Sequence, residues 1–192
     1  MQYLATCRLR FSFLATIPSV EQECKKKAIS QIDIKLTSVA YSFMMGDFDA
    51  VIKEAREAIS QTDCPQKYKN FFESYLIRSI VLTDPDLSRE ELEAQLNGLT
   101  ITDPILAEKT KEVCLALYDL NIAHQSNDYF EDLSNDFKYQ QLEIIYYQAL
   151  NAALKGDKHR AKELFRKLIL EDESLYIVRK AQQYLKDEGN HL

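Results

Sequence analysis

Residues 146–169, YYQALNAALKGDKHRAKELFRKLI, decide the fold. Apolar residues follow the spacing of one helical face up to Gly156-Asp157, and a second face of the same kind begins after it. The first face holds Tyr146, Ala149, Leu150 and Ala153, and the second holds Ala161, Leu164, Phe165, Leu168 and Ile169. Two helices joined by so short a turn run antiparallel and bury these faces on each other. The stretch therefore predicts a helical hairpin.

The same pattern stands near the start of the chain. A helical face ends at Gly46-Asp47, and a second face begins at Val51; together they contain Ile29, Ile32, Leu36, Val39, Ala40, Phe43, Val51, Ile52, Ala55, Ala58 and Ile59. Superposing Gly46 on Gly156 places Val51, Ala55, Ala58 and Ile59 on Ala161, Phe165, Leu168 and Ile169. Because both the turn and the spacing of the apolar residues after it recur, the sequence indicates an internal repeat, with equivalent hairpins stacked in one array.

Further helices are predicted around and between these hairpins. Residues 68–82 form one helix, a Ser88/Glu91 capping box opens another over 89–99, and Asp103-Pro104 starts a third that reaches about residue 124. A Ser19/Gln22 capping box opens a helix near the start, and a last helix covers 175–188. Turns near residues 46, 84, 127 and 156 then divide the chain into about four hairpins.

Composition agrees with one helical domain over residues 1–192. Glycine and proline number only 4 each, which disfavours sandwiches, barrels and disorder. The 24 basic and 30 acidic side chains give a net charge of −6. An acidic balance also argues against a nucleic-acid surface, which needs a basic face to neutralise phosphates.

On these residues the chain resembles the tetratricopeptide-repeat (TPR) proteins and TPR-like helical repeat proteins. Within 147–172, Ala149 and Ala161 match the small residues of the family's two helices, Gly156-Asp157 matches the turn, and Phe165 matches the aromatic position. The proline that usually closes a repeat is absent, and motifs cover about a third of the chain. The resemblance implies an all-α fold of antiparallel helix pairs, stacked as a TPR-like right-handed superhelix with about four hairpins and a C-terminal capping helix.

The resemblance also implies a partner-binding groove. In this family the first helices of the pairs line the inner face of the superhelix, which holds extended or helical peptides. Projected onto this chain, the groove residues are Asp33, Leu36, Ala40, Phe43, Met44, Leu117, Asn121, His124, Glu143, Tyr146 and Leu150, with Cys114, Gln125, Ala153 and Leu154 at the remaining projected positions. Family members that clamp a carboxylate tail offer Lys, Arg and Asn here. Only Asn121 matches, so recognition of an acidic C-terminus is not expected.

Apolar side chains at both ends of such a groove need a cover. Three covers stay open: an amphipathic partner segment, a second copy in a homo-oligomer, or the chain's own apolar segment 1–19, which contains Tyr3, Leu4, Leu9, Phe11, Phe13 and Leu14. A fourth interpretation is that the projection is a residue or two out of register. The side chains would then be ordinary core between helices.

Nothing in the sequence proposes an enzyme. The three histidines, His124, His159 and His191, are isolated, and the common nucleotide, metalloprotease and nucleophile motifs are absent. Residues 84–88 are similar to the start of a calcium loop, but Arg89 and Gln95 replace its essential glycine and glutamate. We expect no catalytic residue, no metal and no cofactor.

Cysteine usage and hydropathy favour the cytoplasm. The four cysteines stand far apart without a CxxC pair, as expected of reduced thiols. No apolar run is long enough to cross a membrane, and no membrane partner is expected. Segment 1–19 has the charge and apolar stretch of a weak signal peptide, but it has no clear cleavage site, so a retained structural segment is preferred.

The expected function is therefore non-catalytic binding of another protein or peptide through a partly apolar groove. A scaffold, a chaperone and an inhibitor or immunity-like protein all fit this expectation. The alternative is a peptide-sensing regulator with a TPR-like sensor domain, although residues 1–30 are too short to supply a DNA-binding helix-turn-helix. An enzyme with an unrecognised activity is the last alternative.

Overall fold

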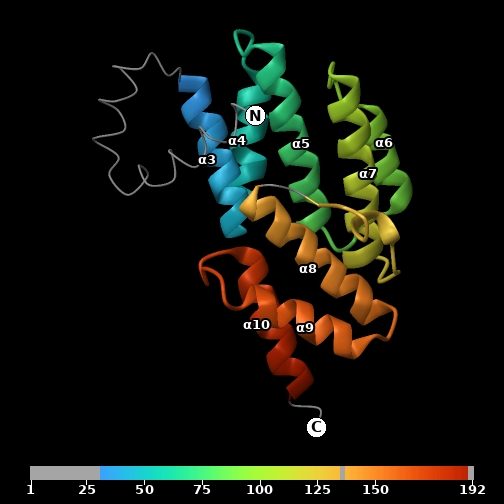
Figure 1. Ribbon diagram of the computed structural model, residues 1–192. Coiled ribbons are helices and arrows are strands. Elements are labelled where there is room, and N and C mark those ends of the chain that lie inside the picture. The colour runs from blue at the N-terminus through green and yellow to red at the C-terminus, as the bar shows by residue number, and fades with distance from the viewer. Residues whose placement is uncertain (1–30, 135–136, 190–192) are drawn as a thin grey trace.

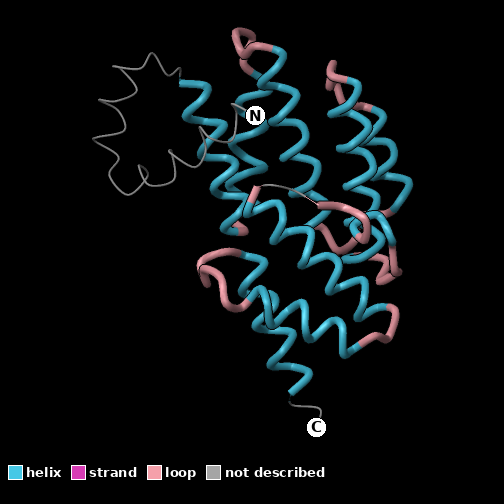
Figure 2. Tube along the Cα trace, in the orientation of Figure 1, coloured by secondary structure: helices cyan, strands magenta, loops and turns pink. Residues whose placement is uncertain are grey.

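The computed structural model describes residues 31–134 and 137–189. These residues form eight α-helices and one short 3-10 helix, without any strand (Figure 2). The elements are α3 (Gln31–Met45), α4 (Phe48–Ser60), α5 (Gln66–Thr83), α6 (Arg89–Asn97), α7 (Pro104–Asn121), η1 (Asp128–Phe130), α8 (Lys138–Leu154), α9 (Lys158–Leu168) and α10 (Tyr176–Gly189). The predicted all-α class is confirmed. Segment 1–19 and the Ser19/Gln22 capping box lie outside the described residues.

The two Gly-Asp turns have the same local structure. Gly46 and Gly156 have φ angles of +75° and +81°, in the left-handed region that glycine enters without strain. In both turns the next amide, of Asp47 or Asp157, donates to the carbonyl five residues before it over 2.9 Å. Each Asp carboxylate then accepts from the amide three residues later and caps the following helix. The repeat seen in the sequence is therefore a repeated hydrogen-bonding pattern.

Burial repeats along with the turns. Three of the four superposed pairs are fully buried, with 0% exposure: Val51, Ala55 and Ala58 in α4, and Ala161, Phe165 and Leu168 at the matching positions of α9. The fourth pair, Ile59 and Ile169, is half-buried. The two sets differ in volume, because Ala55 corresponds to Phe165. The helix-pair pattern is thus conserved between the hairpins while the side chains that fill each core are different.

The helices form an upright group and a lower group. Helices α3 to α7 run side by side, while α8 crosses below them at an angle and α9 and α10 lie beyond it (Figure 1). In the upright group α3 packs on α4 and α5, and α5 packs on α7. In the lower group α8 and α9 form the second Gly-Asp hairpin, and α10 covers it. One apolar core runs from α5 to α10, and another lies among α3, α4 and α5.

The segment after α7 differs from the predicted third hairpin. The sequence predicts a turn near residue 127 between the two helices of a hairpin. In the structure Asn127 accepts a hydrogen bond from Tyr129 N–H at 2.8 Å and caps only the three-residue helix η1. Sixteen residues, 122–137, therefore join α7 to α8, and two of them, 135–136, lie outside the description.

Helix α10 returns to the first hairpin. The Tyr176 ring meets the Phe48 ring edge to face, with centroids 5.0 Å apart, and its atoms lie directly against Gly46. Arg179 Nη2 donates to the carbonyl of Met45 at 2.6 Å. The end of α3 and the start of α10 are thus joined, although more than 130 residues separate them in sequence.

A buried ion pair joins the two groups of helices. Arg78 of α5 donates to Glu143 of α8 at 2.5 Å, and the Arg78 guanidinium lies 4.6 Å from the centroid of the Phe43 ring. Burial by itself would lower the pKa of Arg78, but Glu143, acting together with Tyr147, Tyr75 and Cys114, outweighs burial and holds that pKa above its ordinary value. Because both side chains are mostly out of water, removing either partner would leave an uncompensated charge.

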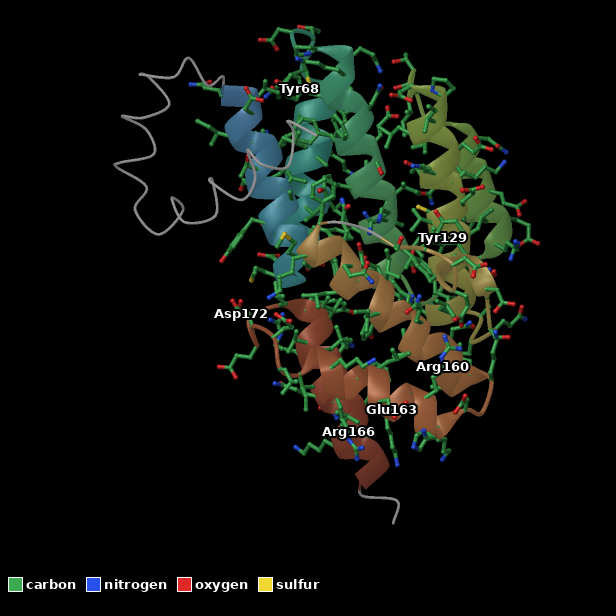
Figure 3. All side chains as sticks on the ribbon, viewed as in Figure 1. Tyr68, Tyr129, Arg160, Glu163, Arg166 and Asp172 are labelled. Carbon is green, nitrogen blue, oxygen red and sulfur yellow. The ribbon has the colours of Figure 1, made fainter. Side chains whose placement is uncertain are left out.

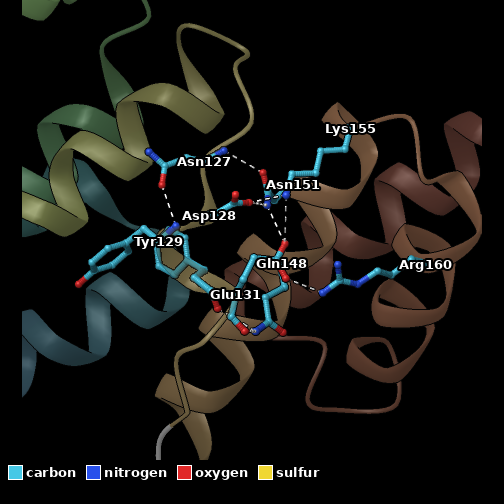
Figure 4. Close-up of polar contacts among 9 residues, drawn as sticks. Asn127, Asp128, Tyr129, Glu131, Gln148, Asn151, Lys155 and Arg160 are labelled. Carbon is cyan, nitrogen blue, oxygen red and sulfur yellow. Dashed lines mark hydrogen bonds and ion pairs between the residues drawn. The ribbon is translucent and has the colours of Figure 1, made fainter.

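A polar network fixes η1 between α7 and α9 (Figure 4). Its centre is Asn151, which is 0% exposed. The Asn151 Oδ1 accepts from Asn127 N–H at 2.8 Å, and its Nδ2 donates to Glu131 Oε1 at 2.7 Å. Glu131 also binds Arg160 of α9 at 2.5 Å. Asn127 Nδ2 in turn donates to Asp119 Oδ2 of α7 at 2.6 Å. These bonds satisfy a buried amide and connect α8 and α9 to the end of α7.

Candidate functional site

A hollow of about 390 Å³ opens where α7 ends beside the second hairpin. Four helices contribute to it, so it depends on how the upright and lower groups meet. Its lining is mostly apolar and aromatic, with a few polar groups. The lining residues are Leu120, Asn121, His124, Tyr146, Leu150, Ala153, Leu154, Lys158 and Tyr184. An apolar concavity with few polar groups is the usual form of a binding site.

The end of α7 places His124 beside the hollow. The amide of Ala123 donates to Tyr118 O at 3.0 Å, and the amide of Gln125 donates to Asp119 O at 2.8 Å. This bonding closes the helix with one left-handed residue, a position that usually holds glycine. Here it holds His124, with φ +51°. A left-handed conformation is unfavourable for a residue with a side chain, and such strain occurs often at functional positions.

Helix α8 forms one wall of the hollow. Tyr146, Leu150, Ala153 and Leu154 follow helical spacing, so they lie on one side of the helix. Tyr146 is 6% exposed, and burial raises the pKa of its hydroxyl, which keeps the phenol neutral. Leu154, at 38%, is among the more exposed large apolar side chains of the described residues. The wall thus passes from the buried core at Tyr146 to solvent at Leu154.

Six of the fifteen projected groove positions gather at this hollow. They are Asn121, His124, Tyr146, Leu150, Ala153 and Leu154. The projection placed them on one surface because it treated α7 and α8 as neighbouring first helices, and their ends do meet here. Lys158 and Tyr184 were not projected. They come from the start of α9 and from α10, so a search confined to the first helices of the pairs could not find them.

The other groove residues predicted from the sequence lie elsewhere. Phe43 and Leu117 are buried in the cores, and Glu143 pairs with Arg78. Asp33 accepts a hydrogen bond from the Tyr68 hydroxyl at 2.7 Å, so it ties α3 to α5. Three more positions in α3, namely Leu36, Ala40 and Met44, are half-buried and line no part of the hollow. For Phe43 and Leu117 the location is that of ordinary core between helices.

Residues 31–134 and 137–189 contain no group of three or more His, Cys, Asp or Glu side chains placed to hold a metal ion. Cys64 and Cys114 are both buried, and burial raises the pKa of Cys114 to about 12. A thiol with so high a pKa is a poor nucleophile near neutral pH.

Among the described helices, none combines the length and the apolar character that a membrane span requires. Comparison with protein-family models, with curated proteins and with solved structures finds no match to this chain.

Proposed function

We propose that this chain is a non-catalytic, TPR-like interaction module of the cytoplasm that binds a segment of another polypeptide in the hollow between α7, α8 and α10. The observation that carries the proposal is the meeting of Asn121 and His124 with Tyr146 and Leu150 on one concave surface. These residues come from two helices that the sequence assigns to separate hairpins. The two Gly-Asp hairpins support the TPR-like comparison.

The size and lining of the hollow favour a side chain as the occupant. About 390 Å³ accommodates one or two large apolar side chains and is small for an extended cofactor. Leu150 and Leu154 offer apolar area, whereas Asn121 offers an amide at the rim. A helical or extended segment can insert one apolar anchor in such a hollow and make polar contacts around it.

The test is selection of peptides on the full chain. A phage library of random 12-residue peptides is enriched on immobilised wild-type protein, and the enriched peptides are measured by fluorescence anisotropy. The discriminating variant is Leu154→Glu, because Leu154 lines the hollow and is exposed enough to be replaced without opening the core. We expect its affinity to fall at least about tenfold, equivalent to about 1.4 kcal/mol.

The matched control is Leu170→Glu. Leu170 is 84% exposed and does not line the hollow, so the same chemical change there tests for effects of net charge. Circular dichroism and urea unfolding confirm that both variants fold. Peptides that bind wild type and Leu170→Glu but not Leu154→Glu support the proposal. Failure to enrich any peptide, or equal binding by both variants, refutes it.

A further inference from the structure

Charge is divided unevenly along this chain. Residues 31–134, which include α3 to α7, contain 9 Lys and Arg against 19 Asp and Glu, a difference of −10. Helix α9 has the opposite character, with five Lys and Arg (Lys158, Arg160, Lys162, Arg166 and Lys167) against the single acidic Glu163. A basic helix on an otherwise acidic chain creates a local field that attracts acidic groups.

The basic helix begins at the hollow. Lys158 is the first residue of α9 and lines the hollow. Lys162 and Arg166 follow it at intervals of four residues, so the three side chains form one stripe along the helix. Arg166 is exposed on the lower group of helices, where Figure 3 labels it beside Glu163. Within residues 31–134 and 137–189, Arg166 forms no ion pair.

The charge on the lining of the hollow is also positive. No Asp or Glu is among its described lining residues, although the whole chain has 30 acidic side chains. The lining groups with basic nitrogen are Lys158 and His124, which stand at the starts and ends of different helices. Partial negative charge at the ends of α7 and α8 offsets part of the positive charge on Lys158.

We propose that the segment bound in the hollow is acidic: an apolar anchor side chain occupies the hollow, and Asp or Glu residues next to it lie along the stripe Lys158, Lys162 and Arg166. This inference rests on the proposed function and adds the chemical class of the partner. The sequence projection found no Lys or Arg in the groove because it omitted the second helices of the pairs. The structure supplies the basic groups from α9.

The experiment compares three phage libraries of 12-residue peptides on the full chain. All three have the same randomised apolar positions, and their fixed positions are all Glu, all Gln or all Lys. We expect the Glu library to be enriched at least about tenfold over the Gln library, and the Lys library to be depleted. For the best Glu peptide, the Kd should rise several-fold between 50 and 300 mM NaCl, since exposed charges are screened at the higher salt.

Two charge reversals assign the effect to the stripe. Arg166→Glu should remove most of the preference for Glu over Gln peptides. Lys53→Glu is the control, because Lys53 is exposed on α4, away from α9, and the change in net charge is identical. Equal enrichment of the Glu and Gln libraries, or equal effects of the two reversals, overturns the acidic assignment alone. If no library is enriched over a blank surface, the proposed function fails, and this inference falls with it.

Discussion

Replacing the two turn glycines by alanine separates local backbone strain from tertiary packing. Gly46 and Gly156 have nearly the same φ and the same hydrogen bonds, so alanine meets the same backbone penalty at both sites. Their surroundings differ. A Cβ at Gly156 would have no neighbour within 4 Å, whereas a Cβ at Gly46 would lie 2.5 Å from Tyr176 Cδ2 and 2.9 Å from Tyr176 Cβ and Cγ.

The expected magnitudes follow from these distances. The left-handed conformation costs alanine about 1–2 kcal/mol relative to glycine, which is the full effect expected for Gly156→Ala. At Gly46 the Tyr176 ring must also move, and overpacking of this kind adds about 1–3 kcal/mol. The contact includes the Tyr176 Cβ, which is bonded directly to the backbone, so a change of rotamer by the ring alone does not relieve it. Gly46→Ala should therefore lower the free energy of unfolding by about 2–5 kcal/mol.

Urea unfolding at pH 7, followed by circular dichroism, measures both variants. A double-mutant cycle with Tyr176→Ala adds the decisive comparison, because without the ring the cost of Gly46→Ala should fall to that of Gly156→Ala. The reasoning is refuted if the two glycine variants lose the same stability, or if Tyr176→Ala leaves the cost of Gly46→Ala unchanged. Either result would mean that α10 does not pack on the first hairpin.

Four other substitutions probe the remaining features. Glu143→Gln should lower the free energy of unfolding, measured by urea titration, by about 3–5 kcal/mol, because it leaves the buried Arg78 guanidinium without its counter-charge. The double variant Glu143→Gln with Arg78→Met should recover much of this loss. Burial raises the pKa of Cys114 from 9.0 to about 12, so between these pH values the folded chain keeps the thiol proton and the unfolded chain loses it. The free energy of unfolding, measured relative to Cys114→Ala, should therefore be highest below pH 9 and decline as the pH rises toward 12. A difference between the two proteins that stays constant from pH 8 to pH 11 would contradict this. His124→Gly should raise the free energy of unfolding by up to about 1 kcal/mol, because glycine adopts the left-handed conformation without strain. The same change should weaken peptide binding. A loss of stability instead would show that the His124 side chain stabilises the fold. Asn151→Leu should lower the free energy of unfolding by about 1–3 kcal/mol and speed hydrogen exchange of the Asn127 amide, which would lose its acceptor. Unchanged exchange at this amide would show that the network does not hold η1 in place.

Helix positions could be predicted because their causes are local. The capping box of Ser88 and Glu91 and the Asp103-Pro104 start are both present in the structure, since each depends on atoms a few residues apart. The last helix shows the limit of such reasoning. It begins at Tyr176, one residue later than predicted, after a turn in which Asp172 Oδ1 accepts from Ser174 N–H at 2.9 Å.

The candidate site could be predicted only in part. The face of α8 around Tyr146 and Leu150 followed from periodicity, and the end of α7 at His124 followed from the position of the turn. The basic residue Lys158 was missed because the start of α9 reaches the hollow only when the second hairpin lies against α7. The sequence did contain one signal, because residues 158–167 have an excess of Lys and Arg whereas the rest of the chain has an excess of Asp and Glu.

The sequence by itself determined that this chain is helical, where most helices begin and end, and that two Gly-Asp hairpins repeat. These properties depend on spacing and capping within about four turns of helix. Tertiary structure alone decided that α8 crosses the upright helices, that Arg78 meets Glu143, and that Tyr176 rests on Gly46. Those choices depend on the volumes and charges of side chains brought together from distant segments, and the apolar periodicity of a helix is the same whichever neighbour it packs against.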